Sequence, residues 1–228
     1  MNSKSDELEL LSILKSGSQR YVKADVLAAT AMREAIIKGA LSPGQEIDEG
    51  LIAENLNLSR TPVRQGLGIL EAEGLVKRPY RKGAIVTELS PDELEELYTI
   101  RSYIEGLAIR KAVPKYKKDH IQQLKTCLKT FIEKSDVANT YLDMNNRFHM
   151  MLYEPCEWDR LLNLITQLRN VSSRYMIVAH GVIMKHSPTN ATHQDIIEAC
   201  EQGDAIAAEK ILQKHIRNMM RILIKQLS

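Results

Sequence analysis

Two arginines four residues apart, Arg60 and Arg64, open the stretch SRTPVRQGLGILEAEGLVKRP, residues 59–79. Residues four apart share one face of a helix, so both guanidinium groups would project together. An arginine can pair with guanine O6 and N7 in the major groove or clamp a phosphate. The hydroxyls of Ser59 and Thr61 could meet phosphate oxygens at the positive end of the helix dipole. These residues form a candidate nucleic-acid site; the alternative is that the arginines are solvated surface residues.

A second basic group follows in LVKRPYRKGAIVTEL. This stretch alternates like two short strands and predicts a hairpin, with Arg81 and Lys82 at its tip and Gly83 closing the turn. Residues 59–82 hold six Lys and Arg against two Asp and Glu, whereas residues 1–90 as a whole balance 12 against 12. A local basic patch on a neutral background is typical of a nucleic-acid contact.

Three histidines are expected to face the interior of a helical region. His149, His193 and His215 each share a helical stripe with apolar residues, and Asn145 lies one turn before the first of them. Imidazole nitrogens with an oxygen ligand suit Zn, Ni or a similar divalent ion. A single buried histidine is usually a hydrogen-bonded core residue, and that reading stays open here, because the sequence does not show that the three converge.

The elements that must position the arginines are three short helices. Apolar periodicity predicts one over residues 24–38, and Asp48 caps a second that turns Leu51 inward and ends near residue 56. Ser59 is expected to cap the third, which stops at Gly74. With the basic hairpin they predict a winged helix-turn-helix over residues 21–89, preceded by a mobile arm at residues 1–20.

The histidines require a separate helical region. Ser90-Pro91-Asp92-Glu93 has the pattern of a capping box with proline at the first helical position, so a new domain is expected over residues 90–228. The predicted fold class is therefore mainly α, with a winged helix-turn-helix followed by an all-α bundle of about six helices. Their expected ranges are 91–112, 118–134, 137–153, 157–180, 190–202 and 204–226.

Composition agrees with a helical chain that stays in the cytoplasm. Of the 228 residues 44% are hydrophobic, and only 11 glycines and 7 prolines interrupt the chain. No apolar run approaches a membrane span, and the acidic start does not resemble a secretory signal. The three cysteines are widely spaced without a C-x-x-C pair, which favours reduced thiols over a disulfide framework or a Cys-based zinc site.

The stretch LSRTPVRQGLGILEAEGLVKRPYRKGAIV resembles the DNA-binding region of the GntR transcription regulators, whose usual form is close to S-R-T-P-V-R-E-A-L, then L-x-x-x-G-L and a glycine-containing wing. The resemblance covers about residues 24–88. Gly66 and Gly68 stand where better helix formers are usual, each at a cost of about 1 kcal/mol in helix stability. A looser helix or close backbone packing is expected there. The resemblance implies DNA contacts by Ser59, Arg60, Thr61, Arg64, Arg81, Lys82 and Gly83.

Residues 91–226 resemble the FCD effector domain of the FadR branch of GntR regulators, and look closest to its VanR-type subgroup because no extra helix is apparent. Many relatives hold a divalent metal with Asp-x-x-x-His on one helix and two further histidines on the last two. Asn145, His149, His193 and His215 occupy these positions. Asn145 replaces the usual Asp, and its amide oxygen is a neutral and weaker ligand. A bound ion would then favour an anionic effector such as a carboxylate.

Arg101 matches the arginine of the R-x-x-x-E pattern in this family, which often faces the effector pocket. A guanidinium suits a carboxylate, so Arg101 joins the four metal-site residues as a candidate effector contact. The alternative is an internal ion pair with Glu105, one turn on. Arg174 and Tyr175 are weaker pocket candidates.

The resemblance implies a ligand-responsive regulator, a repressor by default, that binds a palindromic operator as a homodimer. The effector would favour one spacing of the two DNA-binding domains over another. The alternative is a metal-dependent enzyme in the C-terminal half, but the sequence has no positioned general base like that of H-E-x-x-H and no nucleophile motif. A haem or gas sensor lacks any motif.

Overall fold

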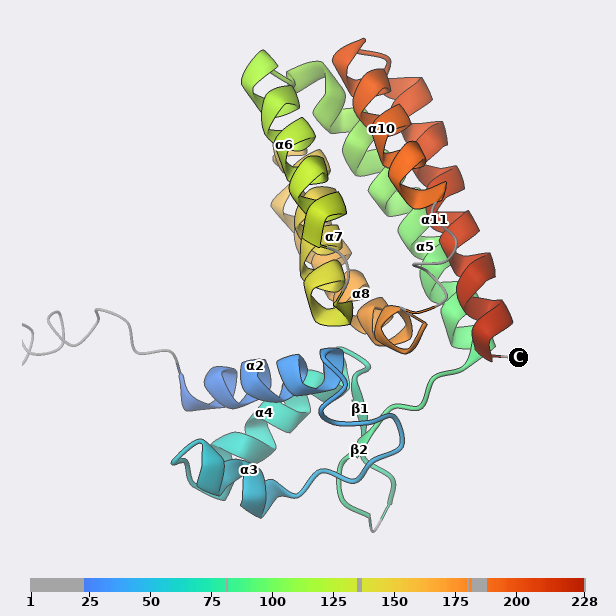
Figure 1. Cartoon of the computed structure of the whole chain (residues 1–228). Coiled ribbons are helices and arrows are strands. Elements are labelled where there is room, and N and C mark those ends of the chain that lie inside the picture. The colour runs from blue at the N-terminus through green and yellow to red at the C-terminus, as the bar shows by residue number, and fades with distance from the viewer. Residues whose placement is uncertain (1–22, 81, 135–136, 180, 182–187, 228) are drawn as a thin grey trace, which may run out of the picture.

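The computed structural model of the chain has an N-terminal winged helix-turn-helix and a C-terminal bundle of long helices (Figure 1). The predicted N-terminal arm and Arg81 lie outside the residues that the structure describes. The described residues are 23–80, 82–134, 137–179, 181 and 188–227.

The N-terminal helices are α2 (Ala24–Ile37), α3 (Glu49–Asn55) and α4 (Arg60–Ala72). Asp48 caps α3 as predicted, because its carboxylate accepts from the amides of Gly50 and Leu51 at 2.8 and 3.0 Å. Ser59 occupies the N-cap position of α4, but its side chain makes no capping hydrogen bond. Its hydroxyl is exposed instead.

The N-terminal core forms where α2 packs on α4. Val63, Leu67 and Leu70 on α4 are fully buried. The predicted inward position of Leu51 is wrong, since this side chain is 56% exposed and Ala53 is the buried residue of α3. The seven-residue α3 packs mainly against α4, so its outer side stays in solvent.

The wing is a small antiparallel sheet of β1 (Val76–Lys77) and β2 (Ile85–Val86). Val76 pairs with Val86 and Lys77 with Ile85, and a further bridge joins Glu46 to Ile85. The turn into β1 follows Gly74, whose φ of +77° suits glycine and ends α4. The predicted hairpin is therefore present.

The C-terminal part consists of long helices joined by short connections. Ser90 caps the first of them, with its hydroxyl accepting from the Glu93 amide at 3.0 Å. None of the described helices combines the length and the apolar character needed to cross a membrane. The helices are α5 (Pro91–Ala112), α6 (Lys118–Lys134), α7 (Ala138–Tyr153), α8 (Asp159–Val178), α10 (Pro188–Glu201) and α11 (Ala205–Leu227), with 3-10 turns η1 (Val113–Lys115) and η2 (Glu154–Cys156).

Helix α11 lies along α5, with α10 beside α11 and α6 beside α7 (Figure 1). Helix α8 packs on both α5 and α7, and it also contacts α2 of the winged helix. One helix thus borders both the centre of the bundle and the winged helix-turn-helix. The apolar stripes of these helices face inward, which directs the polar residues on the same stripes into the bundle.

Candidate functional site

The start of α4 carries the predicted DNA-contacting residues. Ser59, Arg60, Thr61 and Arg64 are all exposed there, opposite the buried face of the helix. Helix α4 is therefore amphipathic: one side packs into the core, and the other presents two guanidinium groups to solvent. Such a surface can enter a major groove with little rearrangement.

The wing contributes the exposed Lys82. Gly83 follows it, and a side chain there would displace the Glu46 carboxylate, which packs closely against this glycine. Arg78 reaches back from the wing and donates to the backbone carbonyl of Arg64 at 2.7 Å. The wing is thereby fastened to the helix that carries the arginines.

The three histidines converge inside the bundle. His149 on α7, His193 on α10 and His215 on α11 each offer a ligand atom, and these atoms lie within 4.8 Å of one another. The ring centroids are 5.3 Å apart for His149 and His193, and 4.6 Å apart for His193 and His215. All three side chains are buried. This cluster, which we call the histidine centre, could hold one metal ion.

The histidine centre is neutral at pH 7. Burial lowers the pKa of His149 and of His193 well below the ordinary value. Burial, aided by the positive charge of Arg169, lowers the pKa of His215 to about 4. Neutral imidazoles keep the lone pairs that metal ions and hydrogen-bond donors require.

Two observations test whether this centre fits a ligand. Neither ring nitrogen of the buried His193 has a hydrogen-bond partner among the described residues. His149 Nδ1 lies 3.1 Å from Tyr153 Oη, whose hydroxyl donates to Glu105 at 2.5 Å. Since the tyrosine hydrogen points to the carboxylate, His149 supplies its own Nδ1 hydrogen to the tyrosine oxygen and keeps the Nε2 lone pair. The donor set therefore fits a metal ion.

A small cavity of about 10 Å³ adjoins the histidine centre. Asn145 is buried on α7 beside it, with its amide nitrogen 4.0 Å from Met176 Sδ. Asn145 therefore borders the same space as His149 and His215. The lining residues are Tyr98, Arg101, Asn145, His149, Met176, His215, Ile216 and Met219.

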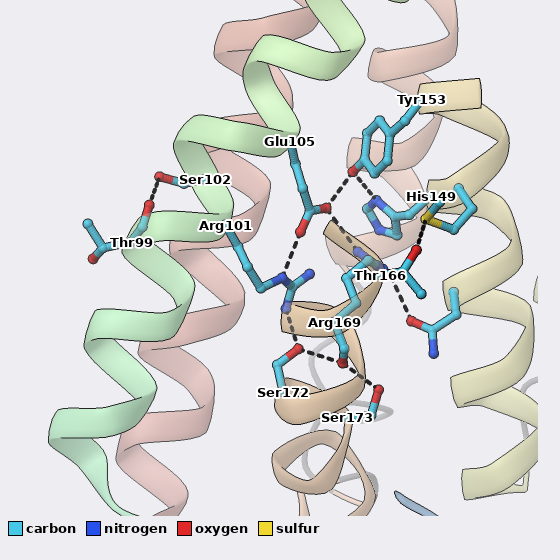
Figure 2. A network of polar contacts seen from close by, with 12 residues as sticks. Thr99, Arg101, Ser102, Glu105, His149, Tyr153, Thr166, Arg169, Ser172 and Ser173 are labelled. Atoms are coloured by element: carbon cyan, nitrogen blue, oxygen red, sulfur yellow. Dashed lines mark hydrogen bonds and ion pairs between the residues drawn. The ribbon is translucent and has the colours of Figure 1, made fainter. Parts of the chain in front are cut away.

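Arg101 forms the predicted ion pair with Glu105 and also borders the cavity. It lines the cavity, and its Nε donates to Glu105 at 2.6 Å (Figure 2). Glu105 also accepts from Arg169 at 2.9 Å, and Arg101 donates to Ser172 at 2.7 Å. Two buried guanidinium groups thus share one buried carboxylate, which leaves a net positive charge beside the histidine centre.

Known families match both parts of the chain. Residues 27–86 match the bacterial regulatory proteins of the gntR family, and residues 96–218 match the FCD domain. The chain belongs to the GntR family. Within it, the FCD domain places the chain in the FadR-type branch.

Individual GntR relatives agree with this assignment. The chain is 30% identical to the Nta operon transcriptional regulator of Aminobacter aminovorans over 186 residues, 79% of this chain and 87% of that protein. It is 25% identical to the HTH-type transcriptional repressor RspR of Escherichia coli K12 over 195 residues, 82% and 83% of the two chains. The solved structure of E. coli McbR/YncC has the same fold, with a TM-score of 0.80 at 20% identity over 91% of this chain and all of that one. The family and the two named relatives are transcription regulators rather than enzymes.

Sequence reasoning missed Arg169, which this GntR-family chain buries at the centre of the polar network. Arg169 lies one turn after the buried Ile165 and three residues before Ser172, on the inward stripe of α8. The sequence signal that could have identified Arg169 was a charged residue at a position of the inward apolar stripe. It remained ambiguous because arginine is usually exposed and its partner Glu105 lies 64 residues away.

Arg174 and Tyr175 do not reach the cavity, contrary to the prediction. Arg174 donates to the Thr87 carbonyl at 2.7 Å, and the Tyr175 hydroxyl donates to Glu93 at 2.5 Å. Both side chains leave α8 toward the start of α5, where Thr87 in the preceding segment provides a backbone acceptor and Glu93 in the first turn of α5 provides a carboxylate. They join the two parts of this regulator.

Proposed function

We propose that this GntR-family protein is a repressor that binds a palindromic operator as a homodimer and is controlled by a small carboxylate-bearing effector. In this proposal residues 21–89 bind DNA, and residues 90–228 bind the effector and form the dimer. Its FCD domain would be of the VanR type. The single observation that carries the effector half is the buried His193, whose two ring nitrogens lack partners among the described residues.

The DNA half of the proposal is supported by the exposed start of α4. Arg60 and Arg64 would read base edges, and Ser59 and Thr61 would meet phosphates. Lys82, with Arg81, would add contacts from the wing to the flanking backbone. A single helix covers few base pairs, so two copies on a palindrome would supply the required specificity.

A divalent metal, Zn or Ni, would be held by His149, His193 and His215, with Asn145 as a weaker oxygen ligand. When bound, the ion would supply positive charge and an open coordination position for an anionic ligand. Arg101 would contact the carboxylate of the effector, because its guanidinium already lines the cavity. The net positive charge of the Arg101–Glu105–Arg169 group favours an anion in the same place.

The cavity of about 10 Å³ has room for an ion but not for an effector of several atoms. An effector would therefore bind a more open state, in which Met176 on α8 or Met219 on α11 moves away. Met176 directly follows Arg174 and Tyr175, which hold the segment before α5. Opening the cavity would thus shift α8 and, through it, the DNA-binding part, and the effector would favour that state by its higher affinity for it.

Elemental analysis of protein purified without chelator tests the metal. Wild type should carry about one equivalent of divalent metal per chain, and His193→Ala should lose it. His120→Ala is the matched control, because His120 lies at the start of α6 outside the histidine centre. Absence of metal from wild type after Zn and Ni are added back would overturn the metal centre, and the histidines would then be hydrogen-bonding groups or core residues.

Selection from a random duplex DNA pool tests the DNA half. Wild type should enrich a palindrome, and Arg64→Ala should lose this preference while keeping the metal content of wild type. Enrichment of the same sequence by Arg64→Ala would contradict base reading by this residue.

A further inference from the structure

Glu49 at the start of α3 forms an ion pair with Arg64 near the start of α4. Glu49 accepts from Arg64 Nε at 2.6 Å. Arg64 nevertheless remains 63% exposed, against 26% for Glu49. The arginine is therefore tethered and still available to an outside partner.

Backbone and side chain of Arg64 are both held. Its carbonyl accepts from Arg78 of the wing at 2.7 Å, while its side chain is held by Glu49 of α3. Side chains as long as arginine otherwise lose much rotamer freedom on binding. The contact with Glu49 reduces that loss before any ligand arrives, and the contact with Arg78 fixes the wing against the same turn of α4.

The atom that Glu49 engages matters for recognition. Glu49 binds Nε, whereas the two terminal amino groups of an arginine can pair end-on with guanine O6 and N7. A carboxylate at Nε therefore orients the guanidinium plane and leaves the base-reading end available. The neighbouring arginine also lies close to α3, since a Cβ at Gly50 would be 3.0 Å from Arg60 Nη2.

Stabilisation of the fold does not explain the pairing of Glu49 with Arg64. An ion pair this exposed contributes little to stability, and its role as an acid in the first turn of α3 needs no arginine. On a DNA-facing surface a carboxylate also weakens binding, because it is repelled by phosphates. Its position is favourable only if it improves discrimination between base sequences.

We propose that Glu49 is a specificity-determining residue that orients Arg64 for guanine. This role rests on the proposed reading of DNA by Arg64. Removing the carboxylate should have two effects of opposite sign. Discrimination for guanine at the contacted position falls because a neutral acceptor orients the guanidinium less firmly than a carboxylate, whereas affinity for unrelated DNA rises because one repelling charge is gone.

The test uses the full chain and the duplex that wild type enriches from a random pool. Affinities are measured for this duplex, for the same duplex with the Arg64-dependent guanine replaced, and for an unrelated duplex of equal length. Glu49→Gln should lower discrimination against the replaced base about tenfold and bind the unrelated duplex at least as tightly as wild type. Unfolding curves of both proteins should coincide within error.

Glu54→Gln is the matched control. Glu54 is an exposed acid on the same helix α3 and has no ion-pair partner among the described residues. It should keep the discrimination of wild type. Equal loss in both variants would overturn the proposal, since net charge alone would then explain the effect.

Arg64→Ala separates this inference from the proposed function. A guanine preference that Arg64→Ala removes and Glu49→Gln leaves intact overturns the role of Glu49 alone. A preference that survives Arg64→Ala overturns base reading by Arg64, and the role of Glu49 with it.

Discussion

Replacing Glu105 with glutamine should destabilise the helical part of the protein strongly. Glu105 is fully buried and accepts from Arg101, Arg169 and Tyr153. It is the carboxylate that faces both of these buried guanidinium groups. Glutamine has nearly the same shape but no charge, so Glu105→Gln leaves two buried cations without an anion.

The expected magnitude follows from this burial. Breaking a buried ion pair by removing one partner costs about 3–5 kcal/mol, because the remaining charge stays desolvated. For a chain of this size that loss lowers the melting temperature by roughly 10 °C. Polar contacts of glutamine with one arginine would retain part of the geometry but none of the charge balance.

The pH dependence of this loss has a defined sign. Burial alone raises the pKa of Glu105, but Arg101 and then Arg169 outweigh it, and the net pKa lies below the ordinary value of 4.5. A carboxyl with a lowered pKa in the folded state stabilises the protein above its unfolded pKa and loses that contribution as pH falls through the folded pKa. The difference between wild type and Glu105→Gln should therefore be full at pH 7 and shrink below about pH 4.

Urea unfolding at pH 7 measures the effect, with Glu209→Gln as control. Glu209 pairs with Arg110 at 3.4 Å, where the arginine is 55% exposed, so its loss should cost about 0–1 kcal/mol. A free energy of unfolding for Glu105→Gln within about 1 kcal/mol of wild type would refute the reasoning. It would mean that water or local rearrangement compensates the buried arginines.

Two further predictions concern packing and coupling. In Gly66→Ala the new Cβ would lie 2.9 Å from the Ala29 nitrogen and the Asp25 carbonyl oxygen of α2, so unfolding free energy should fall by about 1–3 kcal/mol. A Cβ at Gly68 would meet nothing within 4 Å, so Gly68→Ala should raise the free energy of unfolding by about 0.5–1 kcal/mol. Equal changes in the free energy of unfolding for the two variants, measured in urea, would exclude close packing as the reason for Gly66. Tyr175→Phe removes the acceptor of the Ser90 amide, so hydrogen exchange of this amide should accelerate up to about tenfold while the amides of α11 stay protected. An unchanged exchange rate at Ser90 would show that the tyrosine does not hold this segment.

Local signals in the sequence determined the elements of this protein. Asp48, Ser90-Pro91 and Gly74 start or stop helices through contacts within a few residues, so the helix bounds could be predicted closely. The period of 3.6 residues likewise placed each of the three histidines on an inward face. The order of short helices and hairpin then predicted the winged helix-turn-helix.

Tertiary structure alone decided which inward faces meet. The convergence of His149, His193 and His215 depends on how α7, α10 and α11 pack, and periodicity carries no information on that. The pairing of Arg169 with Glu105 depends on α8 crossing α5. Packing also left Leu51 in solvent, although its helical register was compatible with a core position. Short-range caps and periodicity specify what each helix buries, whereas the partner across the interface is set by the close packing of helices distant in sequence.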